Sequence, residues 1–328
     1  MPPCYVRDTK ILTTTGEVVV QDLRAGDMLV TRFGALRALK WVGRRSYAGR
    51  FLGHAQAPVC FRAGSIADNV PNRDLYVSPT HAMVIMDRLV GAYLLVNNST
   101  VTQTATSAQV DYFHLDLGVH DCVVAEGAWS ESYAEHNNRT QFDNLAEFRA
   151  EFPDHISTTQ DRCLPQLHLG DPALAEIRAA LLARVPPEDF RNDPGVHLLV
   201  DGLRVTADST DINEWTFLVP TQASEVRLLS HATTPVSMGA GNDERRLGVC
   251  ISDISIECGD IRITVQADHP GLTRGGHAVE QSMFGARRWT DGNCLLPDGL
   301  FTCFPPGDLT RVTVRGHVLG RYLAERST

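Results

Sequence analysis

The first part of the chain alternates short apolar runs with turn residues. Short runs bounded by glycine, proline, asparagine, aspartate or serine are typical of β-strands. Beyond residue 35, such runs lie at 36–42, 59–61, 75–77, 83–86, 94–96, 110–117 and 122–125. Helical periodicity is rare over this stretch. The pattern predicts an all-β domain over residues 1–144.

The opening residues predict a tight hairpin. Apolar pairs lie at 5–6 and 11–12, and residues 14–17 (TTGE) supply turn chemistry before three valines at 18–20. A second turn over 22–27 leads into another strand. The chain therefore enters its first domain through strands rather than through a helix.

The pattern changes at residue 145. Leu145, Phe148 and Phe152 recur at helical spacing, and Asp171-Pro172 has the cap and the first-turn proline of a second helix. Two further prolines follow at 186–187 and end that helix. We expect a short helical connector over residues 145–191.

Strand-like runs return after residue 191. They lie at 197–200, 216–219, 226–229, 247–256, 261–265 and 309–319. Asp201-Gly202 between apolar runs is a strong signal for a type I′ hairpin turn. We expect a β-sandwich-like accessory domain over residues 192–328, to which the sequence assigns no chemistry, and a mainly β protein as a whole.

The length of the chain bounds the number of domains, and its net charge limits the classes of binding partner. The 328 residues suffice for two domains, each with its own core. A net charge of −9 gives no electrostatic reason to expect nucleic acid or an anionic membrane. No run approaches the ~18 apolar residues of a membrane span, and the first 30 residues lack the apolar core of a Sec signal. We expect a cytoplasmic protein at synthesis; secretion by a signal-independent route leaves no mark in a sequence.

The eight cysteines do not form a metal-binding or redox motif. None is part of a CxxC pair, which argues against a zinc ribbon or a thioredoxin-type site. A zinc site built from His81, His114, His120 and Cys122 is an alternative, because imidazole and thiolate suit zinc, but their irregular spacing disfavours it. We expect neither a metal nor a cofactor.

Cys4 is the first candidate for chemistry. Its thiol follows the Pro3 carbonyl by one peptide bond, so it can attack that carbonyl through a five-membered ring and form a thioester. The substrate would then be the protein's own N-terminal peptide. Two later blocks accompany this cysteine: residues 74–82 (DLYVSPTHA), which contain Ser78 and His81, and residues 112–127, which contain His120 and Asp121.

These three blocks, in this order, resemble the Hint domain, the fold shared by Hedgehog autoprocessing domains and inteins, in its bacterial intein-like form. The resemblance implies that Cys4 is the nucleophile, that His81 donates a proton to the leaving nitrogen and that Ser78 orients the scissile amide. It gives His120 either a supporting catalytic role or a backbone hydrogen bond at a strand end. Asp74 is the nearest candidate for a general base, and an ordinary strand-end carboxylate is its alternative description.

His114 lies where relatives carry an aspartate, and we expect a structural role for it. The chain also lacks the His-Asn junction at which inteins release their downstream segment, so full splicing is not expected. The expected reaction is a single-turnover N-terminal cleavage, in which water, a thiol or an amine resolves the thioester. Only Met1, Pro2 and Pro3 precede Cys4 in this sequence. Three explanations are open: the domain is what remains of a longer precursor, the start is misassigned, or the reaction is vestigial. The alternative is an inactive Hint scaffold whose C-terminal domain binds a glycan or a protein.

Overall fold

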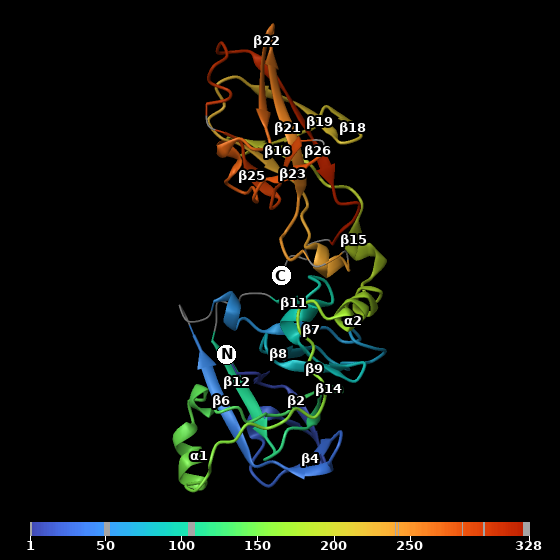
Figure 1. Ribbon diagram of the computed structural model, residues 1–328, viewed down its shortest axis with the longest axis vertical. Helices are drawn as coiled ribbons and strands as arrows, with labels where there is room; N and C mark the ends of the chain where they lie inside the picture. The colour runs from blue at the N-terminus through green and yellow to red at the C-terminus, as the bar shows by residue number, and fades with distance from the viewer. Residues whose placement is uncertain are drawn as a thin grey trace. The chain divides into compact units, whose positions relative to one another are not determined.

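The computed structural model of the protein describes residues 2–48, 53–103, 109–239, 241, 243–283, 285–297 and 299–323. The chain divides into two compact units, Met1–Val185 and Pro186–Thr328, whose elements are labelled in Figure 1. Both units are built mainly from antiparallel strands. The expectation of a mainly β protein is therefore confirmed.

The first unit contains two sheets. One has six strands in the order β11-β7-β8-β1-β12-β6, and the other has eight, with β3 beside β2 and the remainder in the order β10-β9-β14-β13-β2-β4-β5. The strands are β1 (Tyr5–Val6), β2 (Lys10–Thr13), β3 (Gly16–Val19), β4 (Met28–Thr31), β5 (Ala35–Ala38), β6 (Trp41–Tyr47), β7 (Val59–Phe61), β8 (Leu75–Val77), β9 (Ala82–Ile85), β10 (Arg88–Gly91), β11 (Val101–Gln103), β12 (Val110–Asp116), β13 (Cys122–Ala125) and β14 (Ala128–Glu131).

The helices of this unit are short. They are α1 (Leu145–Glu151) and α2 (Pro172–Leu182), with the 3₁₀ helices η1 (Val20–Asp22), η3 (His54–Gln56), η4 (Ala92–Leu95) and η5 (Arg139–Gln141). Helix α2 begins with Pro172 and buries Leu174, Ile177 and Leu181, which lie on one helical face. These three side chains join the core of the first unit.

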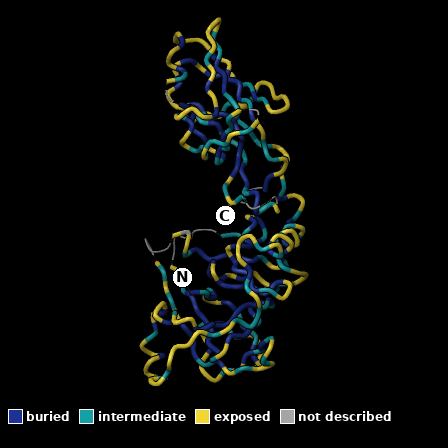
Figure 2. Tube along the Cα trace, in the orientation of Figure 1, coloured by how far each residue is buried: buried dark blue, intermediate teal, exposed yellow. Residues whose placement is uncertain are grey.

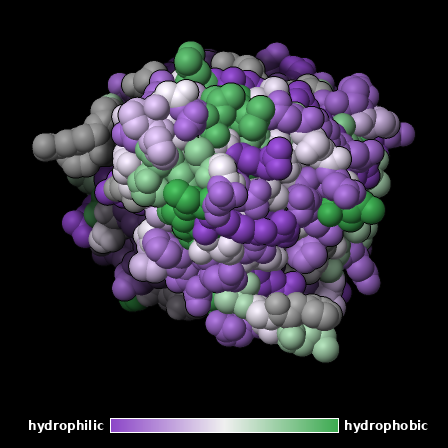
Figure 3. Space-filling model, turned by 90° about the horizontal axis from the view of Figure 1, so that it is seen from above, coloured by the Kyte–Doolittle hydropathy of each residue, from purple (hydrophilic) through white to green (hydrophobic). Residues whose placement is uncertain are grey.

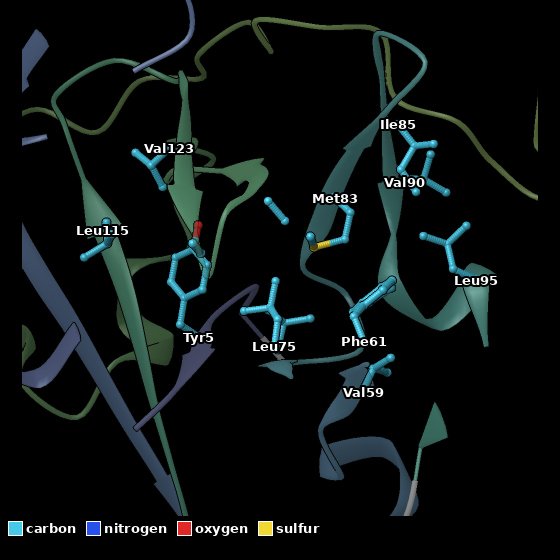
Figure 4. Close-up of a cluster of buried hydrophobic side chains, with 14 of the residues drawn as sticks. Tyr5, Val59, Phe61, Leu75, Met83, Ile85, Val90, Leu95, Leu115 and Val123 are labelled. Atoms are coloured by element: carbon cyan, nitrogen blue, oxygen red, sulfur yellow. The ribbon is translucent and has the colours of Figure 1, made fainter. Parts of the chain in front are cut away.

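That core is made by side chains from both sheets. Figure 4 shows Tyr5 and Leu75, which come from the six-stranded sheet, in one cluster with Met83, which comes from the other. All three are fully buried. The predicted hairpin is also present, because β2 pairs with β3 and Gly16 at their junction has a φ of +110°, a conformation that glycine adopts without steric cost.

Two apolar runs of the first unit were interpreted wrongly from the sequence. The run 36–42 is divided between β5 and β6, which lie in different sheets. The Leu39 N–H donates to the Asp27 carbonyl oxygen, and the Lys40 N–H donates to the Asp116 carbonyl oxygen. The chain therefore passes from one sheet to the other between these two residues. The run 94–96 is not a strand, since Leu94 and Leu95 lie in η4. Both leucines are buried. Their hydrophobicity therefore indicated a buried position, and not a strand.

The strands that were not anticipated include β10 and β14 of the first unit. Strand β10 forms a hairpin with β9 through Met86 and Asp87, which both have positive φ values. Strand β14 covers residues that we interpreted as the exit from the domain, and it pairs with both β13 and β9. The pairing of β14 with the distant β9 lies outside any short local window, so the sequence pattern does not report it.

The second unit has a core enclosed by two main sheets, as in a β-sandwich. Their orders are β17-β16-β20-β25 and β18-β19-β26-β21-β24-β23, with β22 beside β21, and β15 pairs with β27 separately. The strands are β15 (Phe190–Arg191), β16 (His197–Val200), β17 (Leu203–Thr206), β18 (Ser209–Asp211), β19 (Glu214–Pro220), β20 (Val226–Leu229), β21 (Val249–Cys258), β22 (Ile261–Gln266), β23 (Glu280–Ser282), β24 (Gly285–Trp289), β25 (Asn293–Leu295), β26 (Leu309–Val318) and β27 (Tyr322–Leu323). The 3₁₀ helices are η6 (Pro187–Asp189), η7 (Pro235–Met238) and η8 (Pro270–Leu272).

Side chains from both sheets, such as Leu198 of β16 and Phe217 of β19, meet in one apolar cluster. The predicted turn between β16 and β17 is confirmed: Asp201 and Gly202 have φ values of 46° and 84°, as a type I′ turn requires. In Figure 2 the buried stretches follow the strands of each unit, and exposed residues gather at turns.

Figure 3 shows one face, on which small hydrophobic groups are interspersed with hydrophilic residues. Within the described ranges, no helix has both the length and the apolar character needed to cross a membrane.

Candidate active site

Backbone pairing places Cys4 beside Ser78. Strand β1 lies between β8 and β12 in the six-stranded sheet. The antiparallel register that pairs Tyr5 with Val77 continues by one step to Cys4 and Ser78. On the other side of β1, the register with β12 continues in the same way to His114. Cys4 therefore enters the sheet between these two side chains.

The Ser78 hydroxyl holds the backbone on both sides of Pro3. The Cys4 N–H donates to Ser78 Oγ at 2.8 Å, and the hydroxyl donates to the Pro2 carbonyl oxygen at 3.1 Å. In return, the Ser78 N–H donates to the Cys4 carbonyl oxygen at 2.8 Å. Cys4 and Ser78 are fully buried. The peptide bond between Pro3 and Cys4 is thus held from its nitrogen side by one serine.

His81 closes a tight turn that begins at Ser78. Its N–H donates to the Ser78 carbonyl oxygen at 3.0 Å, and Pro79 occupies the second turn position, for which its ring presets φ. The buried imidazole packs edge-on against Tyr5 with 4.4 Å between ring centroids. Neither ring nitrogen of His81 has a hydrogen-bond partner among the described residues. Both nitrogens are therefore available to a reacting group.

The groups around Cys4 are held in uncharged forms. Burial raises the pKa of the Cys4 thiol well above its ordinary value. Burial also lowers the pKa of His81 to about 4 and lowers the pKa of His114 well below its usual range, because a buried imidazolium loses its hydration. At neutral pH the site holds a thiol and two neutral imidazoles. We call Cys4, Ser78, His81 and His114 the neutral cluster.

Glu131, which we did not identify from the sequence, supports the His81 turn from the other sheet. Its Oε1 accepts the N–H of Ala82, the residue after His81, at 2.7 Å. Its Oε2 accepts a hydrogen bond from Arg162 Nη1, also at 2.7 Å. Burial opposes its ionisation, but the hydrogen bond with His120 and the charge of Arg162 lower the pKa of Glu131 to about 2. This carboxylate is ionised throughout the neutral range.

His120 bridges Glu131 and a segment that follows the two sheets. Its Nε2 lies 3.5 Å from Glu131 Oε2, and its Nδ1 accepts the Cys163 N–H at 2.9 Å. Burial opposes charge on this ring, yet the Cys163 thiol and Glu131 raise the pKa of His120 above its ordinary value. The raised pKa favours a protonated ring, whereas the hydrogen bond from Cys163 needs a lone pair at Nδ1, which an imidazolium lacks. The hydrogen-bond geometry favours the neutral ring with its one proton on Nε2. We call His120, Glu131, Arg162 and Cys163 the charged cluster.

The structure brings some of the predicted residues together and separates others. Ser78 connects Cys4 to the His81 turn. His120 belongs to the charged cluster instead. Asp74 lies just before β8, where its Oδ1 accepts the Ala63 N–H at 2.9 Å. Within the described part of the chain, no hydrogen bond or ion pair joins Asp74 or His120 to Cys4.

The residues proposed for a zinc site have other environments. His81 and His114 lie among aromatic rings, with 5.9 Å between their own ring centroids. His120 contacts Glu131, and Cys122 lies beside Cys163. Over the ranges that the structure describes, no three His, Cys, Asp or Glu side chains are arranged to hold a metal ion.

Comparison with known proteins identifies the first unit. The family profile of the Hint domain matches residues 3–137, a range that contains all of the neutral cluster together with His120 and Glu131. No curated protein matches the chain. The matched range begins one residue before Cys4 and ends after β14, so it contains both sheets of the first unit. Residues 3–137 therefore form a Hint domain, and the chain is a Hint-domain protein.

Proposed function

We propose that this Hint domain cleaves its own chain at Pro3–Cys4 through a thioester. The observation that carries the proposal is the Ser78 hydroxyl, which accepts from the Cys4 nitrogen at 2.8 Å and donates to the Pro2 carbonyl at 3.1 Å. A serine in this position fixes the reacting peptide relative to the thiol, and fixed geometry is a large part of catalysis within one molecule. No external substrate is needed, since the scissile bond lies in the same chain.

In the proposed reaction, the Cys4 sulfur attacks the Pro3 carbonyl carbon and a C–S bond forms. The bond between that carbon and the Cys4 nitrogen then breaks, and the nitrogen leaves as an amine. The thiol loses one proton and the departing nitrogen gains one. His81 is our candidate for carrying that proton, because its unpartnered ring nitrogens lie on the turn that holds Ser78.

The charge states of the neutral cluster predict a slow reaction. The attacking species is the thiolate, but burial raises the pKa of Cys4 and lowers that of His81. Transfer of a proton from the thiol to the imidazole therefore costs free energy before any bond is made. The rate should rise with pH by about tenfold per unit as the thiolate fraction grows.

We further propose that the thioester is resolved by water, a thiol or an amine, without splicing. We place the reaction in the cytoplasm, where thiols stay reduced, and all eight cysteines of the chain are unpaired. The role of Asp74 as a general base stays a prediction, which Asp74→Asn tests: a base would slow cleavage when lost, whereas a strand-end carboxylate would leave the rate unchanged.

Trapping by hydroxylamine tests the proposal. Hydroxylamine attacks thioesters readily and amides poorly, so the full chain should lose the residues that precede Cys4 faster in its presence, in proportion to its concentration. Intact mass measured over time reports the loss. Cys60→Ala is the matched control, because Cys60 is also a buried thiol but lies within β7, outside the neutral cluster.

An inactive scaffold is the second candidate. The raised pKa of Cys4 favours it, and the second unit offers a polar hollow of about 430 Å³ on its larger sheet, lined by Glu214, Glu257, Arg262 and Arg315 among others. Such a surface suits hydrogen bonding to a glycan. Retention of residues 1–3 under hydroxylamine, together with glycan binding by the full chain that Arg315→Ala weakens, would favour this function over cleavage.

A further inference from the structure

Two thiols meet where the Hint domain contacts the segment that follows it. Cys122 is the first residue of β13, and Cys163 lies 41 positions further along, in an irregular segment. Their sulfur atoms are 3.4 Å apart. The pair lies outside the neutral cluster, and Cys163 lies beyond the residues matched by the Hint family.

Backbone contacts place Cys163 at this position. The Leu89 N–H donates to the Pro165 carbonyl oxygen at 2.9 Å, and the Leu167 N–H donates to the Leu89 carbonyl oxygen at 2.8 Å. The segment therefore runs along the edge strand β10. Cys122 and Cys163 share an apolar cluster with Leu89. Strand edge, backbone hydrogen bonds and apolar packing all direct the second thiol toward the first.

The two thiols differ in access and in acidity. Cys122 is fully buried, whereas Cys163 is partly exposed. The hydrogen bond between them lowers the pKa of Cys163 and raises the pKa of Cys122. Cys163 is therefore the accessible thiolate, and Cys122 is a protonated thiol directly behind it. Reactive cysteines have this combination of low pKa, exposure and a neighbouring resolving thiol.

We propose that Cys122 and Cys163 are a modification site, at which a hydroperoxide converts the two thiols to a reversible disulfide. The Cys163 thiolate attacks one peroxide oxygen, the O–O bond breaks, and Cys163 becomes a sulfenic acid. The Cys122 sulfur then attacks the Cys163 sulfur, an S–S bond forms, and the sulfenic oxygen leaves as water. Two thiols lose two electrons in total, and hydrogen peroxide is reduced to two molecules of water. The site does not depend on the acyl shift at Cys4.

Closing the bond requires little movement. A disulfide has an S–S distance of about 2.05 Å, so the two sulfur atoms must approach by roughly 1.4 Å. Cys163 lies in a bend rather than in a ladder of paired strands, so its backbone can shift without breaking a sheet. The cross-link then fastens the segment after residue 160 to β13, next to His120.

Peptide mapping of the full chain tests the site. The protein is treated with hydrogen peroxide at a small molar excess, alkylated with iodoacetamide after denaturation, and digested without reductant. We expect the peptides of Cys122 and Cys163 to appear joined, two hydrogens lighter than their sum, and to separate in dithiothreitol. Exposed Cys303 is the internal control, because oxidation governed by exposure alone would modify it first.

Substitutions sharpen the test. Cys163→Ser should leave Cys122 fully alkylated after peroxide, and Cys122→Ala should let Cys163 proceed to the sulfinic acid for want of a resolving thiol. The disulfide should also raise the thermal midpoint by about 5–10 °C, because it restricts the unfolded chain. If Cys163 remains alkylatable in the wild type while Cys303 is oxidised, the proposal is wrong. That result needs no variant, so a misfolded variant does not weaken the test.

Discussion

The neutral and charged clusters are both buried in the Hint domain, but they handle burial in opposite ways. In the neutral cluster, no described residue places a charged group in direct contact with Cys4 or His81, and burial keeps both uncharged. In the charged cluster, Glu131 accepts hydrogen bonds from Arg162 and from the backbone, and it stays ionised. Partners, rather than depth, decide whether a buried group carries charge.

The two clusters have different roles in our proposal. The neutral cluster contains the groups that must exchange a proton during the proposed reaction, and their uncharged state slows the step without preventing it. The charged cluster contains fixed hydrogen bonds that hold the His81 turn through Ala82. Reaction and support are thus separated between neighbouring parts of one fold, and the following changes would break or sharpen that separation.

Removal of the nucleophile has the largest expected effect. Cys4→Ala leaves no sulfur to form the thioester, so cleavage in hydroxylamine should stop altogether, whereas Cys60→Ala should cleave at the wild-type rate. Intact mass over time measures both. Equal release of the N-terminal residues from wild type and Cys4→Ala would assign the cleavage to another process.

Loss of the Glu131 carboxylate from the charged cluster should lower the free energy of unfolding. Glu131→Gln leaves Arg162 without its partner and removes the charge beside His120. Because the Arg162 side chain is 29% exposed, the loss should be about 1.5–3 kcal/mol, the range for a hydrogen bond to a charged group. Denaturant unfolding measures the loss, and NMR titration should show the pKa of His120 falling. Glu126→Gln, which removes a buried carboxylate elsewhere, should leave the His120 titration unchanged; an unaltered His120 in Glu131→Gln would remove the link between these residues.

The neutral cluster should make the fold sensitive to mild acid. Burial lowers the pKa of His81 from 6.5 to about 4, so the unfolded chain binds a proton more readily than the folded one between these values. The stability linked to His81 is complete above about pH 6.5 and is lost as the pH falls to about 4, by about 3 kcal/mol. Unfolding free energies at pH 8 and pH 5 should differ less in His81→Gln. The same pH slope in both proteins would show that His81 is not the cause.

Removal of the serine hydroxyl should have a smaller effect on rate than removal of the thiol. Ser78→Ala leaves the buried Cys4 N–H without its acceptor, and by analogy with other positioning hydrogen bonds the cleavage rate should fall about 10²-fold. Ser78→Thr retains a hydroxyl and should recover most of that rate. If Ser78→Ala cleaves as fast as the wild type, Ser78 is a structural turn residue and the proposed positioning role is lost.

Local sequence signals predicted the strands that carry the neutral cluster. The hairpin at Gly16, strand β8 and the turn over Ser78 and His81 have their own turn residues and apolar runs, so a short window contains the information. The sheet change at Leu39 and the burial of Leu94 in a 3₁₀ helix depend on hydrogen bonds to distant residues. Hydrophobicity alone reports that such residues are buried, and not how their backbone is paired.

The candidate site was predictable only in part, for a related reason. Cys4, Ser78 and His81 lie in recognisable blocks. Glu131 gave a weak signal, as an acidic residue at the end of an apolar strand that was itself missed. Arg162 and Cys163 gave none, because their segment is irregular and reaches the Hint domain through contacts with His120 and Glu131 across more than 30 positions in the chain.

The N-terminal residue of the purified full chain tests the central claim most directly. After incubation with dithiothreitol at alkaline pH, where the thiolate of Cys4 is more abundant, the account predicts that Cys4 becomes the first residue of the chain and that Cys4→Ala keeps its original start. Terminal peptide mapping distinguishes the two. A wild-type chain that keeps Pro3 joined to Cys4 over days of this treatment would contradict the account.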